Sequence, residues 1–126
     1  APEAGDLPLN TFFFDLETTG LKAKSDRVIE IAAKSLRTGS TFSTLVSPGP
    51  GVSLSPKIVE LTGITDEALR AEGVPQFSQA AAAFRAFIDG ESAAVQGPAV
   101  LVAHNGFKFD VPFLAAEFRR MGEELP

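Results

Sequence analysis

Two carboxylates stand two residues apart near the start of the chain, where Asp15 and Glu17 follow the apolar run Thr11–Phe14. Residues two apart in an extended strand point to the same side, so both carboxylates can face one point. A cation between them would relieve their repulsion, and hard oxygen ligands suit Mg²⁺ or Mn²⁺. The motif alone is weak, and the alternative is that Asp15 ends the strand and Glu17 is merely solvated.

Asp110 follows a second apolar run, Ala99–Ala103. Pro112 makes Asp110 a good helix N-cap, a role that is compatible with metal binding. Ligands gather at the strand ends of α/β sheets, and here each of two apolar strands is followed closely by carboxylates. This repeated pattern favours a functional role for Asp110, and a helix N-cap alone is the alternative.

His104 is the single histidine and precedes Asn105-Gly106. A general base needs hydrogen-bond reach to the attacking water, which the sequence does not show for His104. The alternative is a turn at a strand end, with Asn105-Gly106 supplying a permissive backbone. The chain has no cysteine, which excludes disulfides, zinc–thiolate sites and a cysteine nucleophile. It also lacks the P-loop, the G-x-S-x-G and H-E-x-x-H motifs and the glycine-rich dinucleotide fingerprint.

The 126 residues correspond to one domain, and 11 Lys and Arg against 16 Asp and Glu give a net charge of −5. A protein that holds nucleic acid by charge alone should be basic. A nucleic-acid role would therefore take its positive charge from bound metal ions, whereas a solvated acidic surface is the simpler alternative. No apolar run is long enough to span a membrane, and the first ten residues lack the features of a secretory signal, so we expect an intracellular location, in cytoplasm or nucleus.

The hydrophobic patterns predict alternating strands and helices, which indicates an α/β domain with a mixed sheet. Ser55 before Pro56 predicts a helix start and Gly63 a helix stop. The expected strands are 11–14, 27–34, 41–46 and 99–103. The first of them is an apolar run that ends at Asp15, and we expect it to be buried on both faces. The expected helices are 56–62, 65–70, 79–87 and 110–121.

Taken together, four segments resemble the motifs of the DEDD 3′–5′ exonucleases, and the chain is most similar to the DEDDh branch. That branch includes the three-prime repair exonucleases and the polymerase proofreading subunits. Residues 13–21 resemble the first motif, 27–33 the strand that follows it, 61–65 a substrate-contacting turn and 102–110 the second motif.

The resemblance implies a ribonuclease-H-like fold and hydrolysis of a phosphodiester at a 3′ end by two metal ions. By this analogy, the residues that hold two Mg²⁺ or Mn²⁺ ions are Asp15, Glu17 and Asp110. The residues that contact the terminal nucleotide are Thr18, Thr19, Leu21, Leu61, Thr62, Ile64 and Asn105.

The implied products are nucleoside 5′-monophosphates, released from single-stranded or mismatched DNA ends in DNA repair, with RNA as a second substrate class and a homodimer left open. The resemblance divides the chain into a leader, 1–10, and an exonuclease-like domain, 11–126. The family's third motif, with a histidine base and a fourth aspartate, cannot be placed in this sequence. The expectation is thus a part of an exonuclease domain, and the alternative is an inactive relative that acts as a nucleic-acid or protein interaction module.

Overall fold

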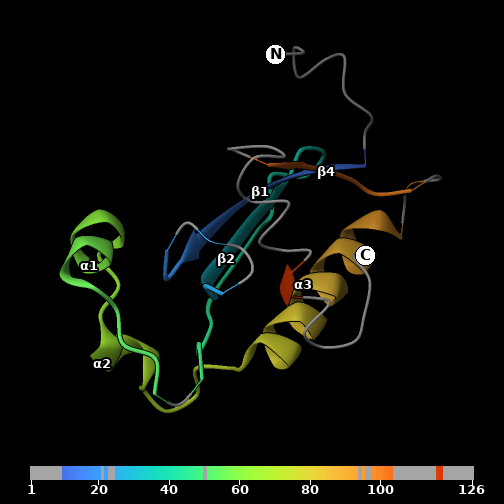
Figure 1. Ribbon diagram of the computed structural model, residues 1–126. Helices are drawn as coiled ribbons and strands as arrows, with labels where there is room; N and C mark the ends of the chain where they lie inside the picture. Colours follow the sequence, from blue (N-terminus) through green and yellow to red (C-terminus); the bar gives the residue numbers. More distant parts are fainter. Residues whose placement is uncertain are drawn as a thin grey trace.

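A four-stranded mixed sheet organises the described part of the chain (Figure 1). The computed structural model describes residues 10–20, 22, 25–49, 51–93, 95, 98–103 and 116–117. The strands are β1 (Thr11–Thr18), β2 (Val28–Ser35), β3 (Thr41–Leu45) and β4 (Val100–Ala103), in the order β3-β2-β1-β4. The β1–β2 and β2–β3 pairs are antiparallel, and β4 runs parallel to β1. The expected α/β class with a mixed sheet is confirmed.

Strand β1 is longer than the sequence pattern indicated, because it continues through both carboxylates to Thr18. Its side chains alternate: Phe12 and Phe14 are buried, whereas Phe13 is 36% exposed. The expectation of a strand that is buried on both faces and ends at Asp15 is therefore wrong. Three consecutive phenylalanines hide the period-two alternation that would otherwise have revealed a strand with one buried face.

Helix α3 (Phe77–Ser92) covers the face of the sheet that holds Phe12 and Phe14. Phe84 is fully buried, and its ring centre lies 6.2 Å from that of Phe42 on β3. The helix is longer than the expected 79–87, since Gln76 and Gln79 form a capping box before it and Gly90 lies within it. Glycine costs a helix interior only about 1 kcal/mol relative to alanine, so it does not by itself end a helix.

Two short helices, α1 (Pro56–Thr62) and α2 (Asp66–Leu69), lie to one side of the sheet (Figure 1). The predicted caps are confirmed: Ser55 accepts a hydrogen bond from the Ile58 backbone, and Gly63 ends α1 at φ 75°. That left-handed backbone is open to glycine at no steric cost. Buried Ile64 joins the helices to Ile29 of β2, in a small core of its own.

Several expected features lie outside the described residues: residues 1–9 of the expected leader 1–10, residues 104–115 and residues 118–126. Within the expected last helix, Ala116 and Glu117 are described and are helical. In the described ranges, no helix is long and apolar enough to cross a membrane.

Truncation of the buried ring at position 84 tests the core. We expect Phe84→Ala to lower the free energy of unfolding by about 3–5 kcal/mol, through lost burial and a residual cavity. Urea unfolding followed by far-UV circular dichroism measures this loss. The matched control is Leu61→Ala, since Leu61 is 69% exposed and should cost less than about 0.5 kcal/mol. Equal losses in the two variants would contradict this packing.

Candidate active site

Asp15 and Glu17 share one face of β1 with Phe13, as their spacing predicted. Across the antiparallel pairing, Glu30 of β2 lies directly opposite Glu17. Three carboxylates therefore gather at this end of the two strands, on the face of the sheet away from α3. The sequence analysis missed Glu30, because its position opposite Glu17 depends on a hairpin register that the strand pattern does not reveal.

Two of these carboxyl groups, Glu17 and Glu30, have raised pKa values. Burial raises the pKa of Glu17 above its ordinary value of 4.5, and the charges of Asp15 and Glu30 raise it further. The pKa of Glu30 is likewise raised by burial and by Asp15. A divalent cation would offset this repulsion, and carboxylate oxygens are the ligands that Mg²⁺ and Mn²⁺ prefer. The donor chemistry thus fits a metal, although no group of three metal-ligating side chains within the described ranges forms a complete site.

The parallel pairing of β1 with β4 brings the end of β4 close to these carboxylates. Phe14, the residue before Asp15, is paired with Ala103, the last residue of β4. The expected site residues Asn105 and Asp110 fall outside the described residues, as does His104.

A groove of about 420 Å³ runs along the sheet beside Asp15. Its described lining includes Phe13 and Val102 from the paired strands β1 and β4, and Lys34 and Ser43 from β2 and β3. Asp15 thus borders a mostly apolar groove with a few polar groups, which is typical of a ligand site.

The two threonines after Glu17 have hydroxyl groups that are engaged within the chain. The Thr18 hydroxyl donates to the Gly20 carbonyl at 2.6 Å. The Thr19 hydroxyl donates to the Asp26 carboxylate at 3.1 Å and accepts from the Arg27 backbone at 2.9 Å. These side chains shape the turn after β1. Leu21, the third residue expected here, lies outside the described residues.

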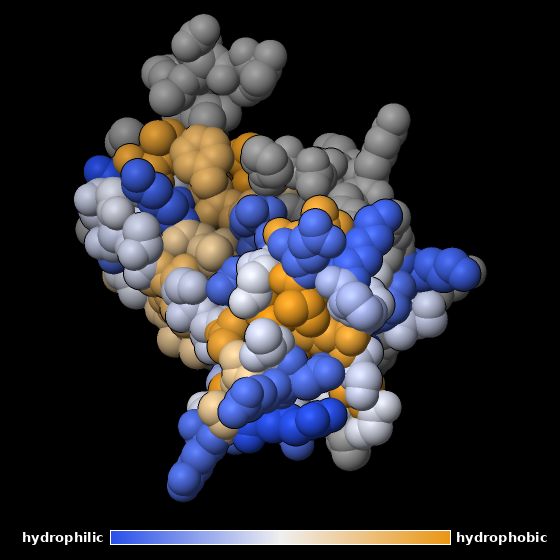
Figure 2. Space-filling model, turned by 90° about the vertical axis from the view of Figure 1, so that its left-hand side faces the viewer, coloured by the Kyte–Doolittle hydropathy of each residue, from blue (hydrophilic) through white to orange (hydrophobic). Residues whose placement is uncertain are grey.

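The turn at the end of α1 was expected to contact the substrate. In this turn Leu61 is exposed, whereas Thr62 and Ile64 support the backbone. Leu61, in the last turn of α1, is 69% exposed. The left-hand side of the molecule in Figure 1, where α1 lies, faces the viewer in Figure 2, and apolar surface lies there among hydrophilic side chains. Ile64 is buried, and the Thr62 hydroxyl donates to the Ile58 carbonyl and accepts from the Ile64 backbone. Of the three expected residues, Leu61 is the one whose side chain is available to a ligand.

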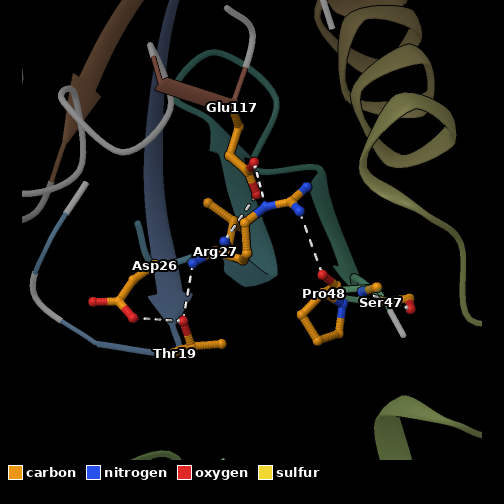
Figure 3. Close-up of polar contacts among 8 residues, drawn as sticks. Thr19, Asp26, Arg27, Ser47, Pro48 and Glu117 are labelled. Atoms are coloured by element: carbon orange, nitrogen blue, oxygen red, sulfur yellow. Dashed lines mark hydrogen bonds and ion pairs between the residues drawn. The ribbon is translucent and has the colours of Figure 1, made fainter. Parts of the chain in front are cut away.

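A buried ion pair ties the start of β2 to a distant part of the chain (Figure 3). The Arg27 Nε donates to Glu117 Oε1 at 2.8 Å, and the Val28 backbone donates to Oε2 at 3.0 Å. Glu117 is 1% exposed. The sequence analysis missed this pair, yet it held a signal: Glu117 lies four residues after Phe113 and three after Leu114, on the apolar stripe of the expected helix.

The mixed sheet with a helix on one face defines an α/β domain, and the family match assigns its class. The family model described as exonuclease (RNase_T) matches residues 12–126, and the chain belongs to that family.

The relatives span plants and bacteria. The chain is 38% identical over 125 residues to an Arabidopsis thaliana protein named exonuclease DPD1, chloroplastic/mitochondrial. It is 43% identical over 107 residues to the DNA polymerase III subunit epsilon of Treponema pallidum. These matches cover 94% and 82% of this chain, but 37% and 44% of the relatives' own lengths.

Solved structures of exonuclease I share the fold. A metal-free complex of the Escherichia coli enzyme with single-stranded DNA matches with a TM-score of 0.73 at 24% identity, covering 90% of this chain and 24% of that one. A product-bound exonuclease I structure gives 0.69 at 26% identity, covering 90% and 26%. The expected ribonuclease-H-like fold and the exonuclease family are confirmed.

The raised pKa values of Glu17 and Glu30 make stability depend on pH. A carboxyl group whose pKa is higher in the folded than in the unfolded protein stabilises the fold when it is protonated. This stabilisation is complete below the ordinary pKa and is lost as the pH rises through the raised pKa. Without divalent metal, the Tm of the native chain should fall as the pH rises above 4.5, the ordinary pKa. We therefore expect Glu30→Gln to raise the Tm at pH 7 and to make this fall smaller. Thermal melts between pH 3.5 and 8 measure this, with exposed Glu60→Gln as the control. The same shift in both variants would contradict the proposed repulsion.

Loss of Glu117 should be costly because Arg27 would keep its charge in a half-buried position. We expect Glu117→Ala to lower the free energy of unfolding by about 3 kcal/mol, the lower end for a broken buried pair, since Arg27 is 31% exposed. Urea unfolding of both single variants and of the Arg27→Ala/Glu117→Ala double variant measures the coupling. Strictly additive losses would show that the two side chains do not interact.

Proposed function

We propose that this chain forms part of a metal-dependent 3′–5′ exonuclease that hydrolyses phosphodiester bonds at nucleic-acid 3′ ends and releases nucleoside 5′-monophosphates. The main support is that a chain of the exonuclease family carries Asp15 and Glu17 on one strand face, where β4 ends beside them. The chain spans less than half of the named plant and spirochaete relatives, so the activity of the whole protein belongs to this proposal.

The proposed ligands of two Mg²⁺ or Mn²⁺ ions are Asp15, Glu17 and Asp110. When bound, such ions activate a water and stabilise the leaving oxygen of the phosphodiester. Asp15 and Glu17 supply oxygens from one face of β1, and Glu30 adds negative potential from the paired position on β2. This arrangement also accounts for an acidic protein with a nucleic-acid substrate, because the phosphate is drawn to the metal ions and not to a basic surface.

The proposed substrate is single-stranded or mismatched DNA, with RNA as a second class. The turn that Thr18 and Thr19 shape would receive the terminal nucleotide, with Leu21 beside it and Asn105 positioning the chain. Exposed Leu61 would pack on the base, while Thr62 and Ile64 hold that turn in place. The exonuclease I structures with single-stranded DNA support a substrate of this kind.

Digestion of a single-stranded DNA labelled at its 5′ end tests the activity. With Mn²⁺, we expect a ladder that shortens from the 3′ end. We expect Asp15→Asn to slow it by more than about 100-fold, since even residues that only orient metal ligands cost 10–100-fold. The matched control is Asp89→Asn, an exposed aspartate of α3.

Thermal melts with Mn²⁺ separate the possible failures. Metal at about 100 times its Kd should add about 2.7 kcal/mol to the free energy of unfolding, and Asp15→Asn should abolish this gain. An Asp15-dependent gain without a ladder would contradict activity of this chain by itself. It would favour either a part of an exonuclease domain without the third motif or an inactive interaction module. The absence of both would contradict the metal site itself.

A further inference from the structure

The turn between β1 and β2 is built around the carboxylate of Asp26. Its Oδ1 accepts from the Thr19 hydroxyl at 3.1 Å, and its Oδ2 accepts from the Lys22 backbone N–H at 3.0 Å. The Asp26 backbone N–H donates to the Lys22 carbonyl at 2.7 Å. The Asp26 side chain thus holds both Thr19 and Lys22, in the segment that follows Asp15 and Glu17.

Gly20 fits this arrangement because it has no side chain. A Cβ at position 20 would lie 2.4 Å from Asp26 Oδ2, closer than any real Cβ contact. The backbone of Gly20 does not have the positive φ of the left-handed region, so the glycine is needed for the close approach of the carboxylate and not for its own conformation.

The other side of the turn is anchored to the sheet (Figure 3). The Arg27 backbone N–H donates to the Thr19 hydroxyl at 2.9 Å, and the Thr19 backbone N–H donates to the Arg27 carbonyl at 2.8 Å. Arg27 is in turn held by buried Glu117. The Thr19 hydroxyl therefore lies between Asp26 and Arg27, donating to one and accepting from the other.

We propose that Asp26 is a positioning residue for substrate binding, which fixes Thr18–Gly20 and Lys22 in the shape that receives the 3′-terminal nucleotide. The inference rests on the proposed exonuclease function and adds to it a residue that acts through the turn. Both carboxylate oxygens are engaged inside the turn, so Asp26 organises the backbone that meets the substrate. Metal binding stays with Asp15 and Glu17.

A double-mutant cycle between positions 20 and 26 tests this directly in the full chain. The probe is a 5′-fluorescein-labelled oligothymidylate of eight nucleotides, whose Kd is measured by fluorescence anisotropy in Ca²⁺. We expect Asp26→Ala to weaken binding about 10-fold, through the loss of two hydrogen bonds. Asp26→Asn keeps one carbonyl acceptor and should weaken binding about 3-fold.

Gly20→Ala should also weaken binding about 10-fold in the native background, since its methyl group displaces the carboxylate. In the Asp26→Ala background the obstacle is gone, so Gly20→Ala should add little. The Mn²⁺ affinity, measured by isothermal titration calorimetry without DNA, should stay unchanged in every variant. Asp89→Asn again serves as the matched control.

The outcomes distinguish the two proposals. If the native chain does not bind the oligonucleotide, the proposed function fails, and this inference fails with it. If the native chain binds and Asp26→Ala binds equally well, only the positioning role is overturned. Additive effects of the two substitutions would also overturn it, as would a parallel loss of Mn²⁺ affinity, because both would indicate general damage to the strand end.

Discussion

The geometry of β1 holds two carboxylates on one face, and the repulsion between like charges there is the main physical constraint on the candidate site. The period-two alternation of the strand places Asp15 and Glu17 on the same side, and the hairpin register adds Glu30 opposite Glu17. Folding partly buries Glu17 and Glu30 and brings these negative charges together, and both effects, burial above all, raise the pKa of the two glutamates. A folded chain at neutral pH therefore carries an unfavourable interaction that a divalent cation would relieve.

The remaining contacts bring distant parts of the chain to this strand end. The parallel pairing of β4 places Ala103 beside Phe14, the residue that precedes the first carboxylate. The Arg27–Glu117 pair ties the start of β2 to a residue 90 positions further along the chain. On the other face, α3 packs against the buried phenylalanines and leaves the carboxylate face uncovered by that helix. The site thus combines a rigid sheet with a turn whose shape is fixed by side chains.

Much of this arrangement could be predicted from the sequence, because its signals were local. The caps of α1, the shared face of Asp15 and Glu17 and the mixed sheet all followed from spacing and residue type. The exonuclease family followed from the order of four segments. The burial of β1 was misread because Phe13 is apolar like its buried neighbours, and α3 extended past a glycine that a helix tolerates.

The features that the sequence did not reveal depend on tertiary contacts. Glu30 joined the carboxylates through a register that strand patterns leave open. Glu117 was visible as a charge on an apolar helix stripe, but its partner Arg27 lies 90 residues away. Asp26 carried no signal in the sequence, and its proposed positioning role rests on its contacts with Thr19 and Lys22 and its close approach to Gly20.

The central claim is that the end of β1 binds a divalent metal, and paramagnetic broadening by Mn²⁺ tests it most directly. In ¹H–¹⁵N spectra at substoichiometric Mn²⁺, we expect the amide signals of Asp15, Glu17 and Glu30 to broaden first. Asp15→Asn should abolish this selectivity. Broadening that begins at exposed acidic residues such as Glu60, Glu67 and Glu72, or that is unchanged in Asp15→Asn, would contradict the account.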